Sequence, residues 1–239
     1  MSGSGIPMEP TPLSDIHLPE RAVNEITSAN LDEWITNHRV TVQRQWWAST
    51  LADAGLADTV VGEDITRGQI FRLAARSATD PDAALTLLWN SLAWGSGNSI
   101  RNNKKRIASV AENPSRSAEL LMEAARLSRT SPKAAYELLY PRFKGAIGQL
   151  GPAFFTKYLY FAGSGEADYP CAILDENVAR ALHDTCGWKS LPIKGGWHPN
   201  AYERYCTRLG MWVDKHEGIT RRDMIERWLF EEGKRLADQ

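Results

Sequence analysis

Residues 148–157 read Gly148-Gln149-Leu150-Gly151-Pro152-Ala153-Phe154-Phe155-Thr156-Lys157, a stretch that predicts a tight turn followed by a helix. The two glycines permit the close backbone approach that a turn between helices requires. Pro152 suits the first helical position, because its missing N–H would find no partner there in any case. We therefore expect a hairpin between two helices, with the second helix covering residues 152–162.

Helical periodicity dominates the rest of the chain. Apolar residues recur three and four positions apart in most segments, and no segment alternates as a strand would. Thr66-Arg67-Gly68-Gln69 reads as a capping box, and Pro81 and Pro132 also suit first helical turns. The other predicted helices cover residues 40–54, 67–77, 81–94, 99–111, 115–128, 132–139, 200–215 and 223–236, and one more begins at Asp175.

These patterns predict an all-α fold, a two-lobed helical bundle with a helix-hairpin-helix module and a cleft between the lobes. The chain has 239 residues, 43% of them hydrophobic, which is enough for a sizeable core. Residues 1–16 are rich in Gly, Ser and Pro and are expected to form a flexible tail. Residues 17–130 are expected to form a helical lobe, and residues 131–239 the helix-hairpin-helix lobe with the C-terminal helices.

Charge and cysteine usage limit the classes of protein. The 28 basic and 29 acidic residues give a net charge of −1, so the total charge does not indicate a nucleic-acid partner. Three scattered cysteines do not form a disulfide framework, and no metal-ligand spacing is present. The chain has neither a signal peptide nor an apolar run long enough to cross a bilayer. We expect a cytoplasmic, nucleoid-associated protein without a cofactor, a metal or a membrane.

One basic run stands out locally. Lys104, Lys105 and Arg106 follow Arg101-Asn102-Asn103 with no acidic residue among them. A handful of such side chains on one face is enough to contact DNA phosphates. A solvated helix face explains a single run of charges more simply.

Asp175 lies at the start of a predicted helix, in the stretch Ile173-Leu174-Asp175-Glu176-Asn177-Val178-Ala179-Arg180. Cleavage of the bond between a base and its sugar passes through a state with positive charge near C1′, which an adjacent carboxylate stabilises. The N-terminus of a helix favours the ionised carboxylate. Asp is also a common N-cap residue, and on position alone capping is the better explanation.

The hairpin stretch and the stretch around Asp175 resemble the helix-hairpin-helix DNA glycosylases, in particular their 8-oxoguanine DNA glycosylase-like branch. The similarity covers about residues 85–230 and is most specific in the blocks 151–162 and 174–180. The resemblance implies that Asp175 is the catalytic carboxylate. In bifunctional members a lysine eighteen residues earlier attacks C1′ and forms a Schiff base, and Lys157 has that spacing.

Lys157 keeps two interpretations open. It lies six residues after Gly151, about one helical turn deeper than the usual lysine of this family. The 8-oxoguanine-glycosylase-like branch carries a lysine at this place, which favours the nucleophile. If Lys157 instead contacts a phosphate or lies on the helix surface, the enzyme is monofunctional and Asp175 assists attack by water.

The hairpin has a second expected role, in DNA backbone binding. Backbone N–H groups around Gly148, Gln149 and Gly151 can point at a DNA phosphate beside the N-terminus of the following helix. An ordinary turn between two helices accounts for the same glycines.

Aromatic residues supply candidates for a base pocket, because a base flipped out of the duplex is commonly held between aromatic faces. The chain has nine tryptophans. We expect Trp94, Phe154, Trp212 and Trp228 to line the pocket. Trp94 is favoured because Gly95-Ser96-Gly97 follows it and leaves room for a ligand. Core packing is the commoner role for each of them individually.

The sequence thus predicts a monomeric DNA glycosylase that flips a modified base out of double-stranded DNA, excises it and leaves an abasic site, with or without AP-lyase activity. The base is an oxidised purine such as 8-oxoguanine, or a hypermodified phage base such as glucosylated hydroxymethylcytosine attacked in anti-phage defence. Two other classes remain open. One is a non-catalytic helix-hairpin-helix DNA-binding module, and the other is an all-α interaction protein in which these residues are structural.

Overall fold

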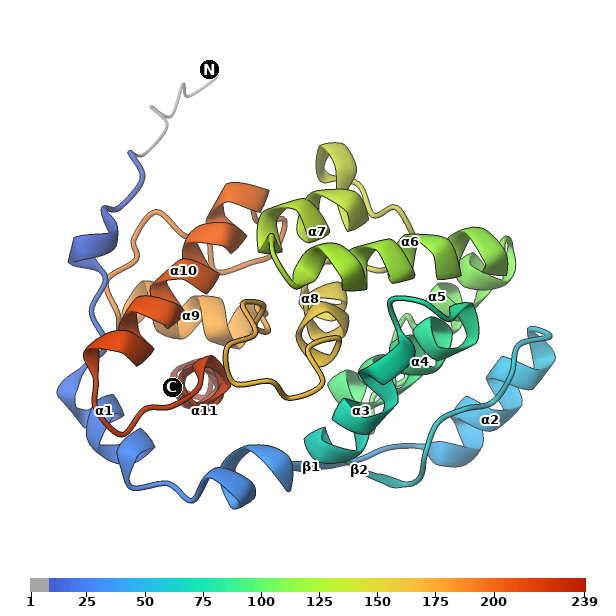
Figure 1. Cartoon of the computed structure of the whole chain (residues 1–239), viewed down its shortest axis with the longest axis horizontal. Coiled ribbons are helices and arrows are strands. Elements are labelled where there is room, and N and C mark those ends of the chain that lie inside the picture. The colour runs from blue at the N-terminus through green and yellow to red at the C-terminus, as the bar shows by residue number, and fades with distance from the viewer. Residues whose placement is uncertain (1–8) are drawn as a thin grey trace.

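The structure is a computed structural model that describes residues 9–239, and helices make up most of it (Figure 1). The predicted all-α class is therefore confirmed. The α-helices are α1 (Glu20–Thr27), α2 (Arg44–Asp53), α3 (Arg67–Leu73), α4 (Pro81–Ser96), α5 (Asn103–Ala111), α6 (Pro114–Ser128), α7 (Pro132–Leu139), α8 (Pro152–Phe161), α9 (Glu176–Asp184), α10 (Pro199–Lys215) and α11 (Arg222–Ala237). Short helical turns are η1 (Leu13–Asp15), η2 (Asp32–Thr36), η3 (Ala74–Arg76) and η4 (Pro141–Phe143).

Two short strands were not predicted from the sequence. Strand β1 (Arg39–Thr41) pairs antiparallel with β2 (Asp64–Thr66), and Val40 lies opposite Ile65. The pairing continues where the Val42 N–H donates to the carbonyl of Glu63 at 2.7 Å. The predicted helix over residues 40–54 therefore begins only at Arg44. Strands of three residues are too short for an alternating pattern to be visible in the sequence.

The predicted helix starts are confirmed where a capping residue marks them, with or without a proline at the first helical position. Thr66 forms the capping box with Gln69, and its hydroxyl accepts from the Gln69 backbone N–H. Asp80 caps α4 and Ser131 caps α7. The helix expected from residue 99 begins at Asn103 instead, because Asn102 has a φ of 62°, which does not belong to a right-handed helix.

Helix α8 lies in the middle of the molecule, between the N-terminal helices α3 and α4 and the C-terminal helices α9 to α11 (Figure 1). It packs against α4, α6 and α7. Helix α11 packs closely on the start of α9, where a Cβ atom at Gly233 would lie 1.9 Å from the Asn177 carbonyl oxygen. Only glycine fits this contact, which fixes the position of α9 relative to α11.

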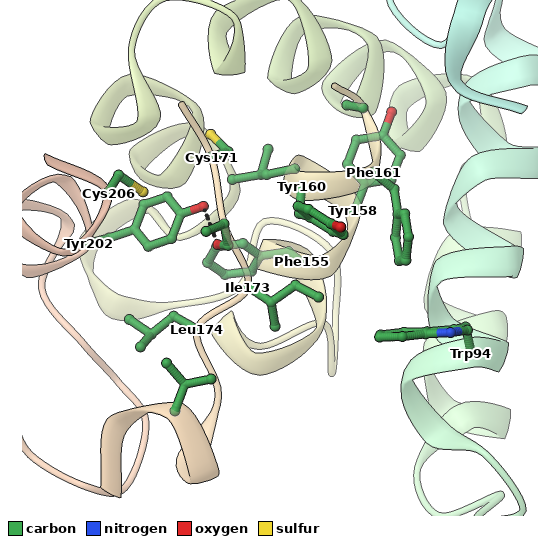
Figure 2. Packing of buried hydrophobic residues seen from close by; sticks show 14 of the residues in the cluster. Trp94, Phe155, Tyr158, Tyr160, Phe161, Cys171, Ile173, Leu174, Tyr202 and Cys206 are labelled. Atoms are coloured by element: carbon green, nitrogen blue, oxygen red, sulfur yellow. Dashed lines mark hydrogen bonds between the residues drawn. The ribbon is translucent and has the colours of Figure 1, made fainter. Parts of the chain in front are cut away.

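The core around α8 is largely aromatic, and its hydroxyl groups hold the segment that leads to α9 (Figure 2). The Tyr202 hydroxyl donates to the carbonyl of Ala172 at 2.9 Å, and the Tyr205 hydroxyl donates to the carbonyl of Ile173 at 2.7 Å. These bonds satisfy the backbone of an extended, buried segment that has no strand partner. Asp175 comes two residues after Ile173, so these bonds hold the chain close to it.

Part of the expected tail makes specific contacts. Thr11 and Ser190 exchange two hydrogen bonds, at 2.8 and 3.1 Å, and Ile16 is fully buried. The segment from Pro10 onward therefore lies against the C-terminal half of the chain, whereas residues 1–8 of the expected tail lie outside the described residues. The division into lobes at residue 130 and the cleft between them stay predictions.

The three cysteines, Cys171, Cys186 and Cys206, are free and buried. Within residues 9–239, no helix has the length and apolar character needed to cross a membrane.

Candidate active site

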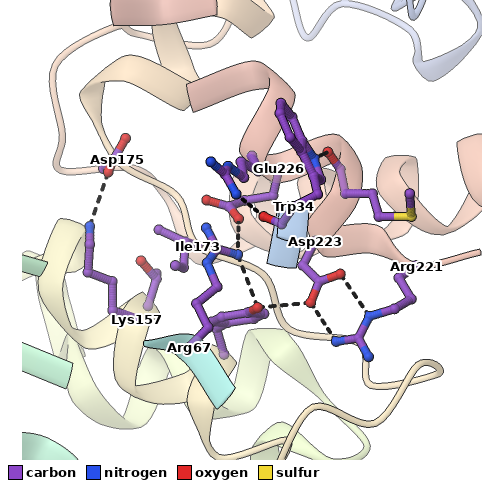
Figure 3. A network of polar contacts seen from close by, with 12 residues as sticks. Trp34, Arg67, Lys157, Ile173, Asp175, Arg221, Asp223 and Glu226 are labelled. Carbon is purple, nitrogen blue, oxygen red and sulfur yellow. Dashed lines mark hydrogen bonds and ion pairs between the residues drawn. The ribbon is translucent and has the colours of Figure 1, made fainter. Parts of the chain in front are cut away.

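Lys157 and Asp175 lie in direct contact (Figure 3). Lys157 Nζ is 3.0 Å from Asp175 Oδ2 and donates a second hydrogen bond of 2.8 Å to the carbonyl of Ala153. Lys157 is only 6% exposed, so this ammonium group is not on the helix surface. The structure thus brings together the two residues that the eighteen-residue spacing had paired.

Asp175 is both the N-cap of α9 and the partner of Lys157. Its Oδ1 accepts from the backbone N–H groups of Asn177 and Val178, each at 3.2 Å, while Oδ2 faces Lys157. The capping and catalytic interpretations therefore do not compete, because each uses a different oxygen.

A pair of hydrogen bonds fixes the distance between the two residues. The Thr156 hydroxyl accepts from the Leu174 N–H at 3.2 Å, and its single proton is shared between the carbonyls of Pro152 at 2.8 Å and Leu174 at 3.1 Å. Thr156 directly precedes Lys157, and Leu174 directly precedes Asp175. The backbone of α8 is therefore tied to the extended segment one residue before the site.

A cavity of about 100 Å³ opens beside this pair. Lys157 and Asp175 lie on its wall together with residues from four other parts of the chain and with Ile173, two residues before Asp175. The remaining lining residues are His38, Val40, Arg67, Trp94, Gly95, Ile173, Glu226 and Phe230. Such a volume holds several water molecules or a small flat group.

A buried ion pair forms another part of the cavity wall (Figure 3). Arg67 Nη1 donates to Glu226 Oε2 at 2.8 Å and to the Tyr160 hydroxyl at 3.0 Å. Tyr160 in turn donates to Asp223 Oδ2 at 2.8 Å, and Arg221 binds the same carboxylate. Burial raises the pKa of Glu226, and the positive charge of Arg67 opposes that rise. Burial disfavours the charged form of Arg67, but Glu226 more than compensates and raises its pKa.

His38 is a neutral member of the cavity wall at physiological pH. Burial lowers its pKa to about 3, and the positive charges of Arg67, Arg227 and Lys234 add to the shift. The imidazole ring meets the indole of Trp94 edge to face, with 5.3 Å between the ring centroids. His38 Nδ1 and Trp94 Nε1 are both buried and have no hydrogen-bond partner among residues 9–239.

The four aromatic residues expected in the base pocket separate into two groups. Trp94 lines the cavity, and the ring of Phe154 flanks Lys157, whose Nζ lies 5.6 Å from the ring centroid. Trp212 and Trp228 are not among the lining residues. Trp212 is buried beneath the guanidinium of Arg208 on the same helix, with 5.0 Å between Arg208 Cζ and the ring centroid.

The orientation of Trp228 follows from helix geometry. Trp228 is two residues after Glu226 on α11, so the two side chains point about 200° apart. Glu226 faces the cavity, and Trp228 faces α1, where its Nε1 donates to Glu25 at 2.5 Å. Trp228 therefore does not line this cavity, because the helix presents Glu226 to it, and a role for Trp228 in base binding stays a prediction.

The predicted hairpin lies between η4 and α8. Gly148 is exposed, and a Cβ atom there would lie 2.4 Å from Ser109 Oγ on α5, so the close approach does require glycine. Gln149, not a glycine, has the left-handed conformation, with a φ of 60°. Gly151 directly precedes Pro152 at the start of α8. The exposed backbone of the hairpin is accessible to a phosphate.

The three residues of the basic run, Lys104, Lys105 and Arg106, fall into two groups, two exposed and one buried. Lys104 and Lys105 are exposed on α5, whereas Arg106 is only 6% exposed. The Arg106 guanidinium stacks 3.7 Å from the ring centroid of Phe154 and donates to the carbonyl of Gln149 at 3.0 Å. Burial lowers the pKa of Arg106 to about 10. Arg106 therefore supports the hairpin from inside, which corrects its prediction as an open phosphate contact.

Several cavity residues were missed by the sequence analysis, namely His38, Val40, Arg67, Glu226 and Phe230. Three of them come from the part of the chain before residue 81, for which the sequence indicated no role. The capping box signalled where Arg67 begins a helix, and Glu226 and Phe230 share a helix face by their spacing of four. Neither pattern distinguishes a cavity from an ordinary core.

No group of three or more His, Cys, Asp or Glu side chains in the described part of the chain is arranged to hold a metal ion. No curated protein and no solved structure matches the chain. A family model described as "Putative 8-oxoguanine DNA glycosylase OGG-like protein" matches residues 33–230, which include every residue of the cavity wall. The match also extends the similarity toward the N-terminus, from about residue 85 to residue 33. The chain therefore belongs to this OGG-like DNA glycosylase family.

Proposed function

We propose that this protein excises an oxidised purine from duplex DNA, with Asp175 and Lys157 acting at the sugar. The contact of 3.0 Å between Lys157 Nζ and Asp175 Oδ2, on the wall of a cavity, is the observation that carries the proposal. A nucleophile beside a carboxylate, both held by backbone hydrogen bonds, has the arrangement that covalent catalysis requires. The family match supports a glycosylase-like activity in general terms.

Asp175 acts on the charge that develops at C1′. As the bond between the base and C1′ breaks, the departing base takes the electron pair, and the sugar gains oxocarbenium character. The Asp175 carboxylate stabilises that positive charge without reorganising, because two backbone N–H groups already hold it.

Lys157 supplies the nucleophile in its neutral form. Its ammonium group transfers a proton to the departing base, and the Nζ electron pair that this frees forms the bond to C1′ as the bond to the base breaks. Asp175 stays ionised throughout this step. Opening of the sugar ring converts the amine adduct to a Schiff base, which water hydrolyses or which loses the 3′ phosphate by elimination. Borohydride reduces the Schiff base to a stable covalent adduct, so this step is open to direct test.

The size of the cavity favours a flat base over a glucosylated one. Trp94 and His38 meet at a right angle beside it, and its volume is about 100 Å³. The small residue Gly95 gives no extra room, because the aliphatic chain of Lys157 occupies the space above it. An oxidised purine such as 8-oxoguanine is therefore the preferred substrate, and a glucosylated phage base is the alternative.

Backbone binding is assigned to the exposed hairpin and to the lysines of α5. The N–H groups near Gly148 and Gly151 lie beside the N-terminus of α8, which favours an anion. Lys104 and Lys105 are exposed on the helix against which Gly148 packs, so they add positive charge close to the same site.

The test is borohydride trapping on duplexes that contain 8-oxoguanine, with modified phage DNA in parallel. We expect a covalent adduct with the wild type, no adduct with Lys157→Ala, and loss of base release with Asp175→Asn. An adduct that persists in Lys157→Ala removes Lys157 as the nucleophile. Binding without base release across the whole panel identifies a non-catalytic DNA-binding module instead.

A further inference from the structure

Glu226 presents an unused oxygen to the cavity. The residue lies on α11, is 1% exposed and lines the cavity wall. Its Oε2 accepts from Arg67 Nη1 at 2.8 Å (Figure 3), while Oε1 has no hydrogen bond to the described part of the chain and is not among its fully buried unpartnered atoms. Since Glu226 lines the cavity, Oε1 is open to that space, where a donor from outside the chain can satisfy it.

Arg67 fixes the orientation of this carboxylate. The guanidinium is buried, donates also to the Tyr160 hydroxyl, and lies 5.0 Å from the centre of the Trp94 ring. Tyr160 is itself anchored through Asp223 to Arg221. Because Arg67 is itself held on several sides, its one hydrogen bond to Glu226 fixes the direction of Oε2 and leaves Oε1 for the cavity.

The position of Glu226 separates it from the chemistry at the sugar. Ile173 lies between the Lys157–Asp175 pair and the Arg67–Glu226 pair, and all five residues line one cavity (Figure 3). A nucleotide whose C1′ is at Lys157 would extend its base toward Glu226. The carboxylate is therefore placed to contact the base and not the reacting bond.

We propose that Glu226 determines specificity by accepting an N–H from the Watson–Crick edge of the flipped base through Oε1, with Arg67 as its positioning residue. This inference rests on the proposed glycosylase function. An ionised carboxylate accepts hydrogen bonds and donates none. It favours an edge with an N–H at the contact and repels an edge with a lone pair there.

The rule distinguishes oxidised guanine from oxidised adenine. Guanine has N1–H and N2–H donors side by side on this edge, whereas adenine has a lone pair at N1, no donor at C2, and a single donor group, the N6 amino group, at the other end of the edge. 8-Oxoguanine and 8-oxoadenine carry the same oxidised N7–C8 edge. They differ along the Watson–Crick edge, which is where Glu226 is proposed to bind. A base that makes this hydrogen bond to the charged carboxylate is expected to be preferred over one that cannot make it by a factor on the order of 10 to 100.

The experiment compares release of 8-oxoguanine and 8-oxoadenine, each opposite the same base, in single-turnover reactions. We expect the wild type to release 8-oxoguanine faster by a factor in that range. Glu226→Gln is expected to lose most of the preference, because its amide offers a donor as well as an acceptor. Glu232→Gln is the matched control, since Glu232 is a buried glutamate on the same helix that binds Arg235 and Arg21 and does not line the cavity.

Equal release of the two bases by the wild type overturns the inference, and so does an unchanged preference in Glu226→Gln. The comparison of bases on the wild type needs no variant, so it stands even if Glu226→Gln does not fold. Failure of the wild type to release any base, glucosylated bases included, contradicts the proposed function itself and is distinguishable from a change in preference.

Discussion

The aliphatic chain of Lys157 lies against the backbone of Gly95: a Cβ atom at residue 95 would be 2.5 Å from Lys157 Cδ and 3.0 Å from Cε. Gly95 is thus the residue of α4 that allows Lys157 to reach Asp175. A helix interior normally disfavours glycine. Here the space that a side chain would fill is occupied by the aliphatic chain of Lys157.

Gly95→Ala is expected to slow Schiff-base trapping strongly while the fold persists. The new methyl group displaces Lys157 from Asp175, and a shift of about 1 Å in a reacting group costs on the order of 100-fold in rate. Single-turnover trapping measures the rate, and thermal unfolding checks the fold. Gly62→Ala is the control, because the nearest atom to its added Cβ is 3.9 Å away. An unchanged trapping rate in Gly95→Ala would show that Lys157 is not held at this point.

The two roles of Asp175 can be separated by two substitutions. Asp175→Asn and Asp175→Ala should both abolish base release, because each removes the negative charge near C1′. Asparagine still caps a helix and alanine does not, so Asp175→Ala should be less stable than Asp175→Asn by about 1 kcal/mol. Urea denaturation of the two variants side by side gives this difference. Substantial base release by Asp175→Asn contradicts the catalytic role.

Stability is expected to fall with decreasing pH because of His38. Its pKa in the folded protein is about 3, below the ordinary value of 6.5, so the unfolded chain binds a proton that the native state does not. The resulting loss of stability begins near pH 6.5 and continues until about pH 3. Denaturation curves at several pH values should show a shallower slope in His38→Gln. Parallel slopes in the two proteins would falsify this assignment.

The basic run should give two different phenotypes in one helix. Lys104→Ala is expected to weaken DNA binding, to reduce the slope of log K against log salt by about one unit, and to leave stability unchanged. Arg106→Met removes the support of Gln149 and Phe154 and should cost about 2 kcal/mol of stability. Binding titrations at several salt concentrations and urea denaturation distinguish the two effects. Identical behaviour of the two variants contradicts the division.

Local sequence signals predicted the parts of the fold that they directly encode. Pro152 after Gly151 marked the start of α8, and Thr66 with Gln69 marked the start of α3, because caps and prolines act within one helical turn. Strands β1 and β2 were missed, since their pairing depends on a partner more than twenty residues away. The local sequence pattern around each strand does not indicate this pairing.

The sequence predicted the part of the site whose residues lie close together in the chain. Lys157 and Asp175 are eighteen residues apart and are joined by the bonds of Thr156. Arg67 and Glu226 are 159 residues apart, and nothing local in either sequence neighbourhood points to the other. Tertiary packing alone creates that pair, and so the wall of the cavity opposite the catalytic residues could not be predicted.

The position of strand β1 bears on how the cavity of this protein could change in evolution. It carries Val40 into the cavity wall and directly follows His38, on a stretch of chain that contributes nothing to the Lys157–Asp175 pair. Substitutions at these two positions alter the shape and polarity next to the base and leave the contacts at the sugar in place. The scaffold thus keeps this wall of the cavity and the reaction proposed at the sugar on separate segments, so that one can diverge while the other is retained.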